Sequence, residues 1–158
     1  MEKKLLPEKE YLESLPKKRM GVGVLLFSED KILILKPTYK DHWLLPGGVI
    51  DLNESPREAA IREVHEELGL QVEIKQLLVV DYLHKAGERT ECIQFLFSGG
   101  NLSKEQIDSI RLQDEEISDM QFVALTEAKK LVSEHTRIRL SFIESNPQKS
   151  IYLENGKI

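Results

Sequence analysis

The chain has 158 residues, about the length of one ordinary domain, and 41% of them are hydrophobic while 31% are charged. A formal net charge of -5 gives no general attraction to nucleic-acid phosphates or anionic lipid, so we expect neither a nucleic-acid polymer nor a membrane as partner. With one cysteine, Cys92, and no apolar run that fits a secretory signal or a membrane span, we expect a cytoplasmic location and a small core residue at Cys92.

Composition sets the first 17 residues apart from the rest. They are charged, contain a few leucines, and leave room for a short helix between Pro7 and Pro16. From Met20 onward the pattern changes to long apolar runs. We therefore expect residues 1–17 to be an appendage and residues 18–158 to form a single domain.

The first half of this domain predicts two strands followed by a helix. Residues 21–27 and 32–35 are apolar and flank a polar turn, which is typical of two strands joined directly. A Pro-Gly-Gly break at 46–48 then separates residues 43–45 from a polar stretch that leads to a helix over residues 56–68.

The second half predicts further strands and a helical tail. Apolar runs at 70–83 and 91–97 flank a polar segment and indicate a second hairpin. A strand at 118–125 leads into a helical tail that reaches about residue 144, and a short strand at 151–153 precedes an Asn-Gly turn signal. This order of elements predicts an α/β (α+β) fold in which helices cover a mixed sheet.

One helix has clear start and stop signals. Ser55 stands at the N-cap, Pro56 follows at the first helical position, and Glu58 completes a capping box. Gly69 stands where a left-handed residue commonly ends a helix. These signals predict a helix over residues 56–68.

The two sides of this helix differ in chemistry. Ile61, Val64 and Leu68 share an apolar sector at helical spacing. Three glutamates fall together roughly opposite and are expected to face solvent: Glu63, Glu66 and Glu67. Such carboxylates repel one another by about a few tenths of a kcal/mol per pair. One interpretation is a solvated acidic face, and the other is a site for Mg²⁺ or Mn²⁺, which prefer hard oxygen ligands.

The spacing around this helix resembles the Nudix box, GX5EX7REUXEEXGU, in which U is a bulky aliphatic residue. Every fixed position of the box has a matching residue here: Gly48, Glu54, Arg62, Glu63, Glu66, Glu67 and Gly69, with Val64 and Leu70 at the aliphatic positions. The box covers residues 48–70, and the flanking apolar strands extend the resemblance to about residues 20–145.

The resemblance implies a Nudix-type α/β/α sandwich with a mixed sheet between helices. It also implies a pyrophosphohydrolase that uses Mg²⁺ or Mn²⁺ to cleave the diphosphate of a nucleoside diphosphate linked to another moiety. The implied partner is therefore a small-molecule nucleoside diphosphate derivative, and members of the family often form homodimers. A second interpretation is a non-catalytic Nudix-fold sensor, although such modules usually lack some of the glutamates that this box retains.

The resemblance also assigns roles within the box. The implied metal ligands are carboxylates and one backbone carbonyl: Glu63, Glu66, Glu67 and the Gly47 carbonyl. Arg62 is expected to orient these carboxylates and to keep their pKa low, because a guanidinium beside acids favours their charged form. Glu54 is expected to be a partner of Arg62 or an outer-sphere ligand.

Hydrolysis requires a group that accepts a proton from water. Glu66 or Glu67 of the box are candidates, but some members of the family use a glutamate in a distal loop. Asp114-Glu115-Glu116 occupies such a place before the strand at 118–125, and Glu116 is our first choice. The alternative is an acidic loop that only solvates the start of this strand.

Four residues outside the box are candidates for substrate binding: Trp43, Lys36, Arg89 and Tyr82. Packing explains Trp43 and Tyr82 equally well, and solubility explains Lys36 and Arg89. The substrate subtype is open, because Ala86 and Glu88 stand where the resemblance would place the proline of ADP-ribose hydrolases and the tyrosine of dinucleoside polyphosphate hydrolases.

Overall fold

The computed structural model describes residues 7–147 and 149–158 of the chain. The strands are β1 (Arg19–Ser28), β2 (Lys31–Pro37), β3 (Gln76–Leu83), β4 (Cys92–Asn101), β5 (Ile117–Ala124) and β6 (Ile151–Glu154). The helices are α1 (Glu8–Ser14), α2 (Pro56–Leu68), α3 (Lys104–Asp108), α4 (Leu125–Leu131) and α5 (Glu134–Ser145). Most strands and α2 agree with the predicted ranges to within a few residues, but β3 begins at Gln76, six residues after the start of the apolar run at 70–83.

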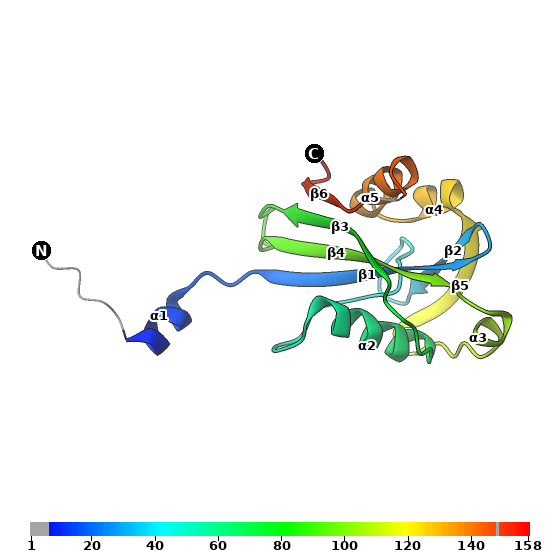
Figure 1. Ribbon diagram of the computed structural model, residues 1–158, viewed down its shortest axis with the longest axis horizontal. Helices are drawn as coiled ribbons and strands as arrows, with labels where there is room; N and C mark the ends of the chain where they lie inside the picture. Colours follow the sequence, from blue (N-terminus) through cyan, green and yellow to red (C-terminus); the bar gives the residue numbers. More distant parts are fainter. Residues whose placement is uncertain (1–6, 148) are drawn as a thin grey trace, which may run out of the picture.

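The six strands form one mixed sheet in the order β5-β2-β1-β4-β3-β6. β1 pairs with β4, and β3 with β6, in parallel, while the other neighbouring strands are antiparallel. Helices α2 and α3 cover one face of the sheet, and α4 and α5 cover the other (Figure 1). The predicted sandwich, with a mixed sheet between helices, is confirmed. No helix among the described residues is long and apolar enough to cross a membrane.

Each face of the sheet has its own apolar core. On the α2 side, alternate residues of β1 such as Val24 and Leu26 pack with Ala60, Val64 and Leu68 of the helix. On the other side the core includes two residues of β2 and two of α5: Ile32, Ile34, Leu140 and Ile143. Cys92 is buried, as its apolar neighbours predict.

The segment that contains the Pro-Gly-Gly break lies between β1 and β2. It forms backbone hydrogen bonds with both strands where they no longer pair with each other. The two strands pair directly near their turn, at Phe27 with Ile32. Farther along, the Val22 and Val24 amides donate to the carbonyls of Gly48 and Pro46, both at 2.8 Å. The Pro-Gly-Gly break therefore lies within the sheet, beside the N-terminal half of β1.

Two features of the C-terminal half differ from expectation. The helical tail is two helices, α4 and α5, because Val132 is extended and Ser133 caps α5 by accepting from the Thr136 amide. The short helix α3 was not predicted, although Ser103 and Gln106 form a capping box there.

The predicted short helix in the N-terminal segment is present as α1. None of its residues is buried, and Figure 1 shows it apart from the sandwich. Residues 1–6 lie outside the described part of the chain. The assignment of residues 1–17 as an appendage stays a prediction.

Candidate functional site

The ends of α2 are held by local contacts of the kind that the sequence predicts. The Ser55 hydroxyl accepts from the Glu58 amide at 3.3 Å, and the Glu58 carboxylate accepts from the Ser55 amide at 2.9 Å. Gly69 ends the helix at φ 69°, in the left-handed region that favours glycine. These caps place the glutamates of the box along a helix with defined ends.

The rotation of α2 about its axis differs from the sequence-based expectation. Glu67, expected to face solvent, is only 6% exposed, whereas Ile61 packs at the edge of the core and is partly exposed. The reason is that the small side chains of Ala59 and Ala60 are fully buried and form part of the contact face with the sheet. The acidic residues are therefore divided, with Glu66 exposed and Glu67 inside.

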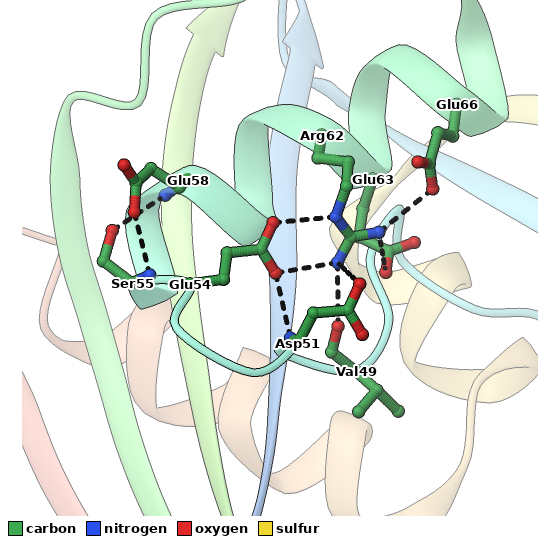
Figure 2. A network of polar contacts seen from close by, with 8 residues as sticks. All are labelled: Val49, Asp51, Glu54, Ser55, Glu58, Arg62, Glu63 and Glu66. Atoms are coloured by element: carbon green, nitrogen blue, oxygen red, sulfur yellow. Dashed lines mark hydrogen bonds and ion pairs between the residues drawn. The ribbon is translucent and has the colours of Figure 1, made fainter.

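Arg62 is the centre of a polar network that joins α2 to the loop before it (Figure 2). Its Nε and Nη2 donate to the two carboxylate oxygens of Glu54 at 2.7 and 2.9 Å, a bidentate pair. Nη2 also donates to the Val49 carbonyl, and Nη1 donates to Glu63 at 2.9 Å and to Glu66 at 3.0 Å. The expected role of Glu54 as a partner of Arg62 agrees with this geometry.

The network perturbs the acidity of its members in different directions. Hydrogen bonds from Arg62, and one from the Asp51 amide, lower the pKa of Glu54 to about 2. Glu63 also bonds to Arg62, yet burial dominates and raises the pKa of Glu63 above its ordinary value. The arginine thus holds Glu54 in its charged form but only partly compensates Glu63.

Glu67 is the most strongly perturbed acid of this site. Burial raises the pKa of Glu67 to about 8, and the nearby charges of Glu63, Glu116 and Glu66 act in the same direction. The Gly47 amide donates to the Glu67 carboxylate at 2.8 Å, which opposes the shift only in part. The site therefore crowds carboxylates beyond what its hydrogen bonds compensate, and Glu67 keeps its proton up to about pH 8 in the absence of a cation.

The Gly-Gly pair lies directly against these carboxylates. A Cβ at Gly48 would collide with the carboxylate of Glu63. Gly47 has φ 140°, and a Cβ there would collide with the Val22 carbonyl of β1. Only glycine fits this close approach of backbone to strand and of backbone to carboxylate.

The donor set suits a hard divalent cation in its chemistry but is not yet arranged around one point. Among residues 7–147 and 149–158, no three Asp, Glu, His or Cys side chains converge as a ready metal site. The cause lies in the network described above, because Glu63 and Glu66 turn to Arg62 while Glu67 turns to Gly47. Uncompensated carboxylates beside a glycine backbone are oxygen donors of the type that Mg²⁺ and Mn²⁺ bind.

The segment before β5 brings Glu116 to the same place. The Gln113 amide donates to the Glu67 carbonyl at the end of α2, at 3.2 Å, and the Thr38 amide donates to the Glu116 carbonyl at 2.9 Å. The charge of Glu116 acts on both Glu63 and Glu67, so its carboxylate is near the cluster. Glu116 thus lies near the cluster, and its role as a base stays a prediction.

Tyr39 is a neighbour of the cluster that sequence reasoning missed. Burial raises the pKa of Tyr39, as do the charges of Glu116, Glu67 and Glu63. Its position in a loop after β2 carries no motif, so the sequence alone had no signal for it.

A cleft of about 310 Å³ opens on the other side of the Gly-Gly pair, on the α5 side of the sheet. Gly47 and Gly48 line its edge, and Tyr39 stands beside them. The deeper walls come from β1, β4 and α5, including three residues that were not singled out from the sequence: Gln94, Thr136 and Arg139. The cleft is thus adjacent to the carboxylate cluster.

The four predicted substrate residues do not line this cleft. Lys36 donates to the carbonyls of Lys40 and Asp41, and Trp43 packs against the core beside α4 and α5. Tyr82 bonds to Glu91 at the far end of β3, and Arg89 lies in the exposed β3–β4 turn. Their contact with substrate stays a prediction, and none of the four lies in the wall of the cleft.

Comparison with known proteins gives the family. The family model described as NUDIX domain matches residues 17–142, so the chain belongs to the Nudix family. A probable DHNTP pyrophosphohydrolase of Lactococcus lactis subsp. cremoris is 43% identical over 54 residues, 34% of this chain and 32% of the relative. The Nudix hydrolase YvcI of Bacillus subtilis is 31% identical over 105 residues, 61% of this chain and 65% of the relative.

These alignments span about a third of the first relative and less than two thirds of the second. Among solved structures, the NUDIX domain of Shewanella oneidensis NrtR, complexed with ADP ribose, superposes with a TM-score of 0.71. It covers 90% of this chain and 100% of that domain, at 16% identity, which establishes the fold.

Proposed function

We propose that the protein is a Mg²⁺- or Mn²⁺-dependent pyrophosphohydrolase that cleaves the diphosphate of a nucleoside diphosphate derivative. The observation that carries the proposal is a pair of carboxylates with raised pKa, Glu63 and Glu67, with the charge of Glu116 near both. They lie against Gly47 and Gly48, which line a cleft of about 310 Å³. A pyrophosphate would be repelled by these acids alone. With divalent cations between them, the same acids favour its binding.

In this proposal Glu63, Glu66 and Glu67 hold the cation, with the Gly47 carbonyl as a further ligand. A bound divalent cation neutralises pyrophosphate oxygens and lowers the pKa of water at the site. When Glu63 and Glu66 turn from the guanidinium toward the cation, Arg62 stays beside them, because its bidentate pair with Glu54 does not depend on these contacts.

Glu116 is the proposed general base. It accepts a proton from water while the water oxygen bonds to phosphorus and the bridging P–O bond breaks, with the leaving phosphate taking up the electron pair. Its segment is tied to the end of α2 through Gln113 and to the loop of Tyr39 through Thr38, so its backbone keeps a defined position beside the cluster. Glu66 and Glu67 are less suited to this role, since both are assigned to the cation.

The relatives support a nucleotide-like small molecule as substrate. The Lactococcus lactis relative carries the name pyrophosphohydrolase, and the Shewanella oneidensis domain binds ADP ribose. A cleft of about 310 Å³ is of the size that binds small molecules.

A sensor that binds a nucleotide without cleaving it is the second candidate. The Shewanella oneidensis domain shows that this fold accommodates an intact ADP ribose. Hydrolysis is favoured because the carboxylates of the box are all present and the fold brings Glu116 beside them.

The test is turnover of a panel of nucleoside triphosphates, ADP-ribose, nucleotide sugars and dinucleoside polyphosphates, with Mg²⁺, with Mn²⁺ and with a chelator. We expect metal-dependent release of a nucleoside monophosphate from at least one compound. Glu67→Gln should reduce it by about a hundredfold or more, on the order of 3 kcal/mol. Glu134→Gln, at an exposed position of α5, is the matched control and should remain active. Binding of a nucleotide without any cleavage would instead establish the sensor.

Homodimerisation belongs to the same proposal. The apolar side chains Tyr11, Leu12 and Leu15 in and beside α1 are exposed and offer a contact to a second copy. Sedimentation equilibrium of the full chain and of a variant with all three changed to serine is the measurement, and an unchanged dimer in the variant would exclude this contact.

A further inference from the structure

One row of three aligned residues lies on the α5 face of the sheet, and two of them, Gly21 and Gln94, line the cleft. Gln94 of β4 is in register with Gly21 of β1 on one side and with Asp81 of β3 on the other. Along this row, β1 contributes no side chain, β4 contributes a carboxamide and β3 contributes a carboxylate. A Cβ at Gly21 would collide with the Gln94 carboxamide, so this side chain lies flat over the strand.

Arg139 of α5 contacts the carboxylate of this row. Its Nε donates to Asp81 at 2.8 Å, the other oxygen of Asp81 accepts from the Gly156 amide at 3.1 Å, and Asp81 is fully buried. The Arg139 side chain is 11% exposed and lines the cleft. Its Nη2 is buried and has no hydrogen-bond partner among the described residues. Such a group costs stability until an acceptor pairs with it.

Two glycines of one strand leave a flat surface beside this group. Gly21 and Gly23 both line the cleft, and a Cβ at Gly23 would lie 3.1 Å from Leu96. Glycine weakens the interior of a strand and often marks a place where a ligand approaches closely. Apolar side chains of Leu44 and Leu45 complete the walls, so the shape suits a planar ring.

We propose that this cleft binds the planar heterocycle of the substrate and that Arg139 selects rings that carry a carbonyl oxygen, and not an amine, at the position that faces its Nη2. The inference rests on the proposed function, because it takes the ring to belong to the nucleotide-like substrate. A guanidinium only donates hydrogen bonds, so a ring carbonyl satisfies Nη2 whereas a ring amine does not. Asp81 already balances the charge of Arg139, so a neutral acceptor suffices. The partly exposed Gln94 carboxamide lies over Gly21 and turns aside to let the ring reach Nη2.

The wild-type chain provides the first test, with substrates that differ at one ring position. Inosine triphosphate and ATP exchange a carbonyl for an amine, as do UTP and CTP. We expect kcat/KM about tenfold or more higher for the carbonyl member of each pair. Equal values, or preference for the amine, would overturn the proposal.

Calorimetry with inosine and adenosine monophosphates separates this inference from the proposed function. Tighter binding of the inosine compound without any cleavage of triphosphates supports the inference while the proposed function fails. Cleavage without carbonyl preference refutes the inference alone. Absence of binding by both monophosphates, together with absence of cleavage, overturns both.

Arg139→Lys is the matched variant, because it keeps a charge beside Asp81 but removes Nη2. We expect the carbonyl preference to disappear mainly through a higher KM for the carbonyl substrate. Arg137→Lys is the control, since Arg137 lies on the same helix, pairs with Glu134 at 3.7 Å and does not line the cleft. An equal fall for both members of a pair in Arg139→Lys would show a structural role only. If this variant does not fold, as judged by circular dichroism, the wild-type ratios decide alone.

Discussion

Glu67→Gln is expected to stabilise the metal-free protein at alkaline pH. The carboxylate of Glu67 is 6% exposed, and burial together with neighbouring acids raises its pKa to about 8 from an ordinary 4.5. Below pH 4.5 both the folded and the unfolded chain carry the proton, so Glu67 has no effect on stability. Between pH 4.5 and 8 only the folded chain keeps it, so the free energy of unfolding falls as pH rises.

The size of the effect follows from the same pKa. The full difference corresponds to about 5 kcal/mol above pH 8, at 1.36 kcal/mol for each pH unit between the two pKa values. Between pH 6 and pH 8 the expected loss is about 2 kcal/mol, which lowers Tm by roughly 4–8 °C for a domain of this size. Glutamine has the same shape and no charge, so this loss should be absent in Glu67→Gln.

Thermal unfolding at pH 6, 7 and 8 with a chelator present is the measurement. Glu134→Gln, whose side chain is 78% exposed in the wild type, is the control and should keep the wild-type pH dependence. Adding Mg²⁺ at pH 8 should raise Tm of the wild type and not of Glu67→Gln, because a bound ion favours the charged carboxylate. A wild-type Tm that is constant or rises from pH 6 to pH 8, or a slope that survives in Glu67→Gln, would refute the reasoning.

Four further substitutions test the geometry of α2 and of the glycine beside it. Val64→Asp should unfold the chain, because it places a charge at a fully buried position, whereas Ile61→Asp at a partly exposed position should leave a folded protein; circular dichroism distinguishes them. Arg62→Lys should reduce turnover at least about tenfold, since an ammonium lacks the planar fork, and unchanged kinetics would contradict this. Gly48→Ala should weaken Mg²⁺ binding in calorimetry, because its Cβ displaces the Glu63 carboxylate, and an unaltered affinity would remove Glu63 from the ligand set.

The ends of α2 were predictable because the signals are local. Ser55 and Glu58 bond to each other within one turn, and Gly69 adopts its left-handed conformation at the next residue after the helix. The rotation of the helix was not predictable in the same way. It depends on how closely Ala59 and Ala60 approach the sheet, and this tertiary contact turns Glu67 inward.

The cleft illustrates a second limit of local reasoning. Asp81 and Arg139 are 58 positions apart, and neither belongs to a motif. Gln94 reads as one polar residue in an apolar strand, and only the register between β1, β4 and β3 gives it its neighbours. Glu116 could be proposed as a base because an acidic run precedes a predicted strand, which is a pattern within a few residues, and its role stays a prediction.

The Gly-Gly pair belongs to a segment that is hydrogen-bonded into the sheet between β1 and β2. The Val22 and Val24 amides of β1 donate to the carbonyls of Gly48 and Pro46. On the other side, the amide and carbonyl of Leu44 bond to Leu35 of β2 at 2.8 Å. In deuterium exchange these amides should be as slow as those of the central strands. A ligand that enters the cleft would then contact a rigid backbone segment. Side chains such as Tyr39, which is 62% exposed, would be the part of the site that adjusts to the ligand.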